Sequence, residues 1–270
     1  MEIDERIIVT GATGGMGAAA VEALAKEGRP VLMACRNLEK AETVRADILR
    51  RVPGAKLEIG ALDLSSMDSV RTFAESVEPG SVSALFNNAG VISRGYNLTE
   101  DGLENTFSVN YFGPWLLTRL LLSKLPQDAR IVNMVSLTCR FVSIDEASLR
   151  PTEKDFSQLR TYARAKRAMV SFSQELARRY PLLHVNMADP GVVATDMIDL
   201  GCWFDPIADV LVKPLFKTPL SGAQPALRAL REEKQNRYYV GKQCKAIPAR
   251  YMNPSLDERI WEETQKRLNP

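Results

Sequence analysis

Residues 6–17 of the chain read RIIVTGATGGMG, in which five residues of strand character lead straight into a glycine-rich turn. Good helix formers follow over residues 18–27. Gly11 permits a tight turn, Gly15 leaves the backbone open to a ligand, and Gly17 lets the helix approach the sheet. Because free N–H groups and the helix dipole attract anions, this strand–turn–helix unit predicts a pyrophosphate site. We expect the site to be bordered by Gly11, Thr13, Gly14, Gly15, Met16 and Gly17.

The alternation of strand and helix continues along the chain. Apolar runs are expected as strands at residues 30–35, 56–62, 84–86, 130–135, 183–187 and 237–240, and helices are expected at 38–51, 67–76, 102–125 and 162–179. Strands separated by helices form right-handed βαβ units, and therefore a parallel sheet that is covered on both faces. We predict an α/β fold: a single domain over residues 1–270, with one Rossmann-type, doubly wound parallel sheet of about seven strands and helices on both faces.

The end of the second strand, Cys35-Arg36-Asn37, bears on the choice of cofactor. An NAD site usually has an acidic residue here for the ribose hydroxyls, and this stretch has none. Arg36 can instead pair with a 2′-phosphate through its fork of donors, helped by the Thr13 hydroxyl and, more weakly, by Lys40. NADP(H) is therefore favoured over NAD(H), with Arg36 and Asn37 among the binding residues. The alternative interpretation of Arg36 is an ordinary exposed loop charge.

Four polar residues form a second group of interest. Tyr162 and Lys166 are four positions apart and share one face of a helix. The ammonium, together with the charge of an oxidised nicotinamide, is expected to lower the pKa of the phenol, which can then give a proton to a carbonyl oxygen or take one from an alcohol. Ser136 follows a strand at the ligand edge of the sheet and can hold the substrate oxygen. Asn110, in a helix that Pro114 is expected to disturb, can bind a water that relays protons to Lys166. Each residue alone also fits an ordinary helix or loop position.

Taken in order, these motifs resemble those of the short-chain dehydrogenase/reductase superfamily over nearly the whole chain. The matching positions are Thr10-Gly11, Gly15, Gly17, Asp63-Leu64, Asn87-Asn88-Ala89-Gly90, Asn110, Ser136, Tyr162, Lys166, Pro190-Gly191 and Thr195. The resemblance implies that Asp63 and Leu64 line the adenine. It implies that the cofactor is bordered by Asn88, Ala89, Gly90, Pro190 and Gly191, with Tyr162 and Lys166 beside its nicotinamide ribose. Val193 and Thr195 are implied to contact the nicotinamide amide and the phosphates.

Within the superfamily the chain is most similar to the retinol dehydrogenase-like branch, through residues 34–37, 130–133, 216–219 and 222–224 and the tail around Trp261. That branch often has an N-terminal membrane anchor, which we do not expect here, so the resemblance supports the cofactor better than a retinoid substrate. Residues 196–220 are unusually apolar and are expected to cover a lipophilic substrate. The alternatives for this segment are packing against the body or a sister subunit, and contact with a membrane surface. The helices at 115–125 and 162–179 resemble those through which family members dimerise, so a homodimer or tetramer is also considered.

The bulk composition argues against several classes of protein. Basic and acidic residues nearly balance, 35 against 33, and the basic runs at 45–51 and 160–167 are interpreted as solvated helix faces, so nucleic acid is not an expected partner. The four cysteines lack metal-ligand spacing and the single histidine, His184, is interpreted as a core or strand-end residue, so no metal site is expected. No signal peptide is apparent and no run reaches about 18 apolar residues, which predicts a cytoplasmic protein without a membrane span.

Together these observations predict an NADP(H)-dependent carbonyl reductase or alcohol dehydrogenase acting on a lipophilic small molecule. Its catalytic residues are Asn110, Ser136, Tyr162 and Lys166, with Tyr162 as the acid/base. Two alternatives stay open, namely a sensor that binds NADP(H) without turnover and an epimerase or dehydratase on the same fold. Because a sensor needs no proton donor, the complete set of four residues argues against it.

Overall fold

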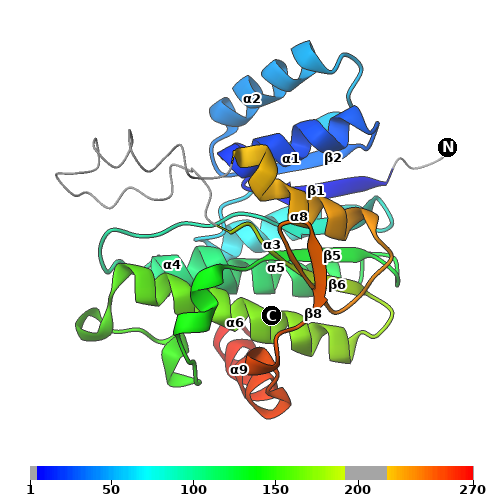
Figure 1. Ribbon diagram of the computed structural model, residues 1–270. Helices are drawn as coiled ribbons and strands as arrows, with labels where there is room; N and C mark the ends of the chain where they lie inside the picture. The colour runs from blue at the N-terminus through cyan, green and yellow to red at the C-terminus, as the bar shows by residue number, and fades with distance from the viewer. Residues whose placement is uncertain (1–4, 192–217, 270) are drawn as a thin grey trace, which may run out of the picture.

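The computed structural model describes residues 5–191 and 218–269, and these form one eight-stranded sheet covered by helices (Figure 1). The strand order is β3-β2-β1-β4-β5-β6-β7-β8. Strands β1 to β7 pair in parallel, and β8 is antiparallel to β7. The strands are β1 (Arg6–Thr10), β2 (Val31–Cys35), β3 (Leu57–Ala61), β4 (Val82–Asn87), β5 (Arg130–Met134), β6 (His184–Asp189), β7 (Arg237–Val240) and β8 (Gln243–Ala246).

The central strands are buried along nearly their whole length, because helices cover both faces of the sheet. The helices are α1 (Gly15–Lys26), α2 (Leu38–Arg51), α3 (Met67–Ser76), α4 (Asn105–Phe107), α5 (Gly113–Leu121), α6 (Gln158–Arg179), α8 (Pro219–Arg231) and α9 (Pro254–Leu268). One core cluster joins the sheet to α1, α2 and α8, and the other joins it to α3, α5, α6 and α9. Figure 1 shows the first group of helices above the sheet and the second below it. The doubly wound α/β prediction is confirmed.

Several predicted bounds hold to the residue, and others differ for physical reasons. The predicted bounds of β1, α2, α3 and β7 match the structure. The expected helix over 102–125 is instead divided into α4, a π-helical segment over Ser108–Phe112, and α5. Pro114 is the second residue of α5, which continues directly from the π-helical segment. The irregularity that was expected near Pro114 is the π-helical segment, which ends at Phe112, just before α5.

The C-terminal part adds an eighth strand that the sequence did not suggest. Strand β8 has only four residues, Gln-Cys-Lys-Ala, which are mostly exposed, so no apolar run marked it. A two-residue turn at Gly241-Lys242 joins it to β7, and Gly241 has a φ of +53°, which suits such a hairpin.

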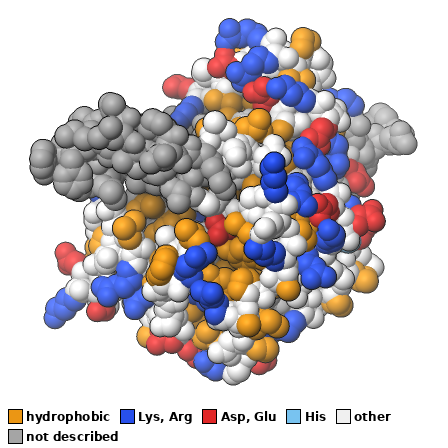
Figure 2. Space-filling view, viewed as in Figure 1, with side chains coloured by type: hydrophobic (Ala, Val, Ile, Leu, Met, Phe, Trp, Pro, Cys, Tyr) orange, Lys and Arg blue, Asp and Glu red, His pale blue; other side chains and the backbone are white. Residues whose placement is uncertain are grey.

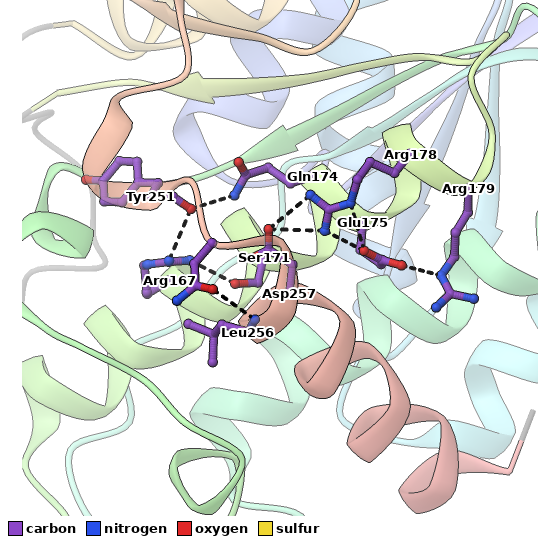
Figure 3. Close-up of polar contacts among 10 residues, drawn as sticks. Arg167, Ser171, Gln174, Glu175, Arg178, Arg179, Tyr251, Leu256 and Asp257 are labelled. Carbon is purple, nitrogen blue, oxygen red and sulfur yellow. Dashed lines mark hydrogen bonds and ion pairs between the residues drawn. The ribbon is translucent and has the colours of Figure 1, made fainter.

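The expected solvated face at 160–167 is wrong for Arg167, which is only 5% exposed. The turn before α9 and α9 itself cover this side of α6 (Figure 3). Arg167 donates to the Ser171 hydroxyl and to the Tyr251 carbonyl, and Gln174 donates to the same carbonyl. Burial lowers the pKa of Arg167. Its charge is therefore used to attach the C-terminal segment to the helix.

A cluster of aromatic rings holds α9 against α5 and α6. The ring centroid of Trp261 lies 5.4 Å from that of Trp115 and 5.7 Å from that of Phe172. The guanidinium groups of Arg119 and Arg179 lie 5.1 and 4.8 Å from the same Trp261 ring. Such ring pairs and cation–π contacts add to the apolar area that they bury. Helix α9 is thereby packed over the outer side of α5 and α6.

Candidate active site

A cleft of about 650 Å³ opens at the carboxyl ends of β1, β2 and β4, where the strand order reverses. Open α/β sheets bind ligands in the crevice at this kind of position. Thirteen of the residues that the sequence assigned to cofactor binding line it, namely Gly11, Thr13, Gly14, Gly15, Met16, Gly17, Arg36, Asn37, Asp63, Leu64, Asn88, Ala89 and Gly90. The structure therefore gathers residues from four separate stretches of the chain around one cavity.

Two glycines bring the turn and helix α1 close together. Gly11 has a φ of +64°, and a Cβ built there would lie 2.9 Å from the Ala89 Cα. A Cβ at Gly17 would lie only 2.2 Å from the Gly11 carbonyl oxygen. The N-cap residue of α1, Gly14, offers no side chain to the helix, and its first turn has no acidic residue. The first N–H groups of α1 are therefore left to bind an anion at the cleft.

Thr10 and Asn88 tie the glycine turn to the end of β4. The Thr10 hydroxyl accepts from the backbone N–H groups of Asn88 and Ala89, both at 3.0 Å. The Asn88 amide donates to the Thr10 carbonyl at 2.8 Å and to the Gly11 carbonyl at 3.3 Å. Asn88 thus lines the cleft and also shapes it. The sequence marked Asn88 as a cofactor neighbour, but the bonding of the buried Thr10 hydroxyl could not be inferred from it.

At the other end of the cleft, Arg36 and Asn37 follow β2 and are exposed. The Asn37 side chain accepts from the Lys40 N–H at 2.8 Å and so caps α2. The Asp63 carboxylate accepts from the Ser65 N–H and hydroxyl, at 2.9 and 2.6 Å. Arg36 lines the cleft at the carboxyl end of β2, and its pairing with a 2′-phosphate stays a prediction.

Tyr162 and Lys166 lie on one face of α6, and the Lys166 ammonium is 5.9 Å from the centre of the Tyr162 ring. Lys166 is 3% exposed and donates to the Met134 carbonyl at 3.1 Å. Burial lowers the pKa of Lys166 to about 8. Burial also raises the pKa of the Tyr162 phenol, and a hydrogen bond from Ser136 opposes this rise. Desolvation of the phenol therefore outweighs this hydrogen bond. The expected lowering of the phenol pKa, which also depends on the charge of an oxidised nicotinamide, stays a prediction.

Asn110 lies in the π-helical segment and faces Gly90 and Lys166. Its amide nitrogen donates to the Val91 and Thr106 carbonyls, both at 2.8 Å. Its side-chain oxygen is buried and has no hydrogen-bond partner within residues 5–191 and 218–269. A Cβ at Gly90 would lie 2.9 Å from that oxygen and 3.5 Å from the Lys166 nitrogen. A buried acceptor beside a buried amine is suited to hold a water between them.

Past the end of β6, the Pro190-Gly191 turn is held by a buried carboxylate that the sequence did not single out. Asp189 accepts from the Gly191 N–H and from the Tyr238 hydroxyl, both at 2.8 Å. An Asp two residues before a positive-φ glycine is the local signal that could have identified this turn. Of the other predicted cofactor residues, Val193 and Thr195 lie outside the described residues, as do residues 196–217 of the expected substrate cover.

On the face of the molecule that Figure 2 shows, charged side chains of both signs are spread over the surface, and hydrophobic side chains gather near the middle. His184 begins β6 as a half-buried strand-end residue, as predicted, and Cys35 is a buried core residue that also lines the cleft. Within residues 5–191 and 218–269, no three His, Cys, Asp or Glu side chains are grouped so as to hold a metal ion. In the same part of the chain no helix is long and apolar enough to span a bilayer.

The fold and the residues at the cleft are those of a Rossmann-type dehydrogenase or reductase. The family model for the short chain dehydrogenase matches residues 5–200, so the chain belongs to the short-chain dehydrogenase family. Within it, the chain is a member of the retinol dehydrogenase-like branch. Retinol dehydrogenase 13 of the mouse (Mus musculus) is 36% identical, in a match that covers 96% of this chain and 82% of that protein. Human retinol dehydrogenase 14 is 31% identical, in a match that covers 95% of this chain and 84% of that protein. The recognition made from the sequence is confirmed.

Solved structures agree with the fold. The crystal structure of an uncharacterized protein from Mycobacterium paratuberculosis has a TM-score of 0.79 at 27% identity, covering 98% of this chain and 93% of that one. A short-chain dehydrogenase from Sphingobium yanoikuyae in complex with NADPH has a TM-score of 0.66 at 18% identity, covering 96% and 94%. At this identity, the similarity to the Sphingobium yanoikuyae structure shows that the two chains share a fold. The family implies a nicotinamide cofactor and a small-molecule substrate.

Proposed function

We propose that the chain is an NADP(H)-dependent oxidoreductase that interconverts a carbonyl and an alcohol, with Tyr162 as the acid/base. The observation that carries the proposal is the meeting of Tyr162, Lys166, Ser136 and Asn110 beside the cleft. The proposal takes residues 1–270 as one catalytic domain, in which 196–220 covers the substrate and Val193 and Thr195 bind the nicotinamide end.

The cleft fits a nicotinamide dinucleotide. The first turn of α1 has no side-chain cap and no acid, so its N–H groups suit a pyrophosphate. The walls of the cleft are lined by Asp63, Leu64 and residues 88–90. The catalytic Lys166 lies beside Gly90. When bound, the nicotinamide gives or accepts the hydride. Every proton step is left to the side chains of the chain itself.

In the proposed mechanism, the Tyr162 phenol holds the proton that the substrate oxygen gains during reduction. Its raised pKa keeps it protonated and ready to donate at neutral pH. The Ser136 hydroxyl positions the same oxygen. With a pKa lowered to about 8, Lys166 can pass a proton toward Tyr162, and the free Asn110 oxygen can hold the water from which Lys166 is replenished.

The preference for NADP(H) rests on Arg36, which is exposed at the cleft in a stretch, Cys35-Arg36-Asn37, that contains no acid to oppose a 2′-phosphate. Its loss should weaken NADPH binding roughly 10- to 100-fold, the equivalent of one or two charge-assisted hydrogen bonds, and leave NADH binding unchanged. Fluorescence titration of Arg36→Ala with both cofactors measures this. Arg50→Ala, at the far end of α2, is the matched control. Equal losses for NADPH and NADH would contradict the assignment.

A lipophilic carbonyl or alcohol is proposed as the substrate class. The apolar composition of 196–220 supports it, and relatives that carry the name retinol dehydrogenase point the same way. NADPH oxidation over a panel of lipophilic aldehydes and ketones tests the reaction, with Tyr162→Phe as the inactive control. Unchanged turnover in that variant would remove Tyr162 from the mechanism. NADPH binding without any turnover would favour a sensor, and products other than an alcohol would favour epimerase or dehydratase chemistry.

A further inference from the structure

The Ser136 hydroxyl receives two hydrogen bonds from a single neighbour. Thr138 donates to it from the backbone N–H at 3.2 Å and from the side-chain hydroxyl at 2.9 Å. Ser136 is also the N-cap residue of the 3-10 turn η2 (Leu137–Phe141), in which Thr138 is the second residue. The two side chains are therefore held together by the backbone of one short turn.

This arrangement decides what the Ser136 hydroxyl can still do. A serine hydroxyl has two lone pairs and one proton. Because the two Thr138 donors occupy both lone pairs, the proton is the group that Ser136 has left for another partner. That partner is an oxygen, and the Tyr162 phenol is a candidate, because Ser136 acts on it to favour its ionised form.

The turn that carries both residues is firmly packed. The Cys139 N–H donates to the Ser136 carbonyl at 3.1 Å, and the Cys139 side chain is 1% exposed. Ser136 itself has an extended backbone, with φ −147° and ψ 148°, two residues after the end of β5. The direction of the two Thr138 donors is thus fixed by the sheet edge and by a buried anchor, and it does not depend on a bound substrate.

We propose that Thr138 is a positioning residue that keeps the single Ser136 proton available for donation, to the Tyr162 phenol before substrate binds and to the substrate oxygen afterwards. The proposal rests on the function proposed above for Ser136. Without the Thr138 hydroxyl, one lone pair of Ser136 is released, and Ser136 can turn to accept the phenol proton. A Ser136 in that orientation no longer stabilises the negative charge that develops on the substrate oxygen during reduction.

The test compares Thr138→Val, which keeps the shape but loses the hydroxyl, with Thr138→Ser, which keeps the hydroxyl. Thr152→Val is the control, since Thr152 is a threonine beside another 3-10 turn, Glu153–Asp155, and its side chain is exposed. We expect Thr138→Val to lower kcat roughly five- to tenfold with KM for substrate and NADPH within twofold. The pH at which alcohol oxidation is half-maximal should move upward. Thr138→Ser should restore both to within about twofold.

A second measurement does not need turnover. In protein labelled with ¹³Cζ-tyrosine, the Tyr162 resonance is assigned by its disappearance in Tyr162→Phe. We expect Thr138→Val to shift this resonance, and neither Thr138→Ser nor Thr152→Val to do so. An unmoved resonance in Thr138→Val, or equal kinetic losses in the Val and Ser variants, overturns the role of Thr138. A wild-type protein without turnover on the carbonyl panel overturns the proposed function instead, and the resonance still decides on Thr138.

Discussion

Replacing Gly17 by Ala should destabilise the protein, although Ala is the better helix former. Gly17 is the third residue of α1, and intrinsic propensity alone favours Ala there by about 1 kcal/mol. The added Cβ, however, would lie 2.2 Å from the Gly11 carbonyl oxygen, 2.8 Å from the Asn88 amide nitrogen and 3.0 Å from the Ala12 Cα. The first and last of these are backbone atoms, so no side-chain rotation relieves the overlap.

The expected size follows from these opposing effects. Overpacking of a tight site costs about 1–3 kcal/mol, and contacts with backbone put Gly17→Ala at the upper end, about 3 kcal/mol. Subtracting the propensity gain of about 1 kcal/mol leaves a net loss of about 2 kcal/mol. For a chain of this size the thermal midpoint should then fall by about 4–8 °C.

Gly15→Ala is a matched control on the same helix. A Cβ at Gly15 would lie 3.5 Å from the nearest atom, the Pro219 Cγ, which is an ordinary contact. We expect Gly15→Ala to keep the thermal midpoint of wild type in a scanning fluorimetry experiment, while it weakens NADPH binding by obstructing the approach of the pyrophosphate. Gly17→Ala should lose both stability and binding. A Gly17→Ala midpoint equal to or above that of wild type would refute the packing argument.

Three other substitutions have definite expected outcomes. Trp261→Ala should lose about 3–5 kcal/mol of unfolding free energy in urea, because Trp261 is 2% exposed and packs on Trp115 and Phe172; an unchanged urea midpoint would contradict this packing. Asn88→Ala should cost about 1–3 kcal/mol in the same assay by leaving the Thr10 carbonyl without its donor, and should also weaken NADPH binding. Burial lowers the pKa of Lys166 to about 8 in the folded chain, whereas the pKa of an unfolded lysine is about 10.4. Below about pH 8 the buried ammonium therefore lowers the free energy of unfolding by its full amount. This loss of stability disappears as the pH rises toward about 10.4. Lys166→Met should therefore melt above wild type at pH 7 without cofactor, with a gap that narrows by pH 10, and a gap that widens would show the opposite shift.

Most of the correct predictions came from patterns of residues that are close together in the sequence. The β1 strand, the glycine turn and α1 are contiguous, so their spacing alone predicts the cleft wall that Gly11 to Gly17 form. Tyr162 and Lys166 lie on one helix, where a separation of four residues places them on the same face. The carboxyl ends of parallel strands meet at one edge, which explains why Asn88 and Arg36, 52 positions apart in the chain, border the same cavity.

The features that the sequence did not predict depend on contacts between distant segments. Arg167 looks like a surface arginine until residues 249–268 cover it, which residues 160–167 do not reveal. The sign of the Tyr162 pKa shift depends on how completely the phenol is desolvated, and spacing contains no information about that. Strand β8 is defined by its pairing with β7 and not by the pattern of its own four residues. The bonding of Thr138 to Ser136 similarly depends on the three-dimensional shape of η2.

The packing of α9 has a consequence for assembly. The helices at 115–125 and 162–179 were expected to offer a surface to a second copy of the chain. In the structure the Trp261 side of α9 already fills the space over α5 and α6, and Thr264 and Arg267 extend the contact to Tyr111 and Phe112. The chain's own helix α9 therefore covers the side of α5 and α6 on which Trp115 and Phe172 lie. A second copy that approached this side would contact α9 before it could reach the Trp115 ring.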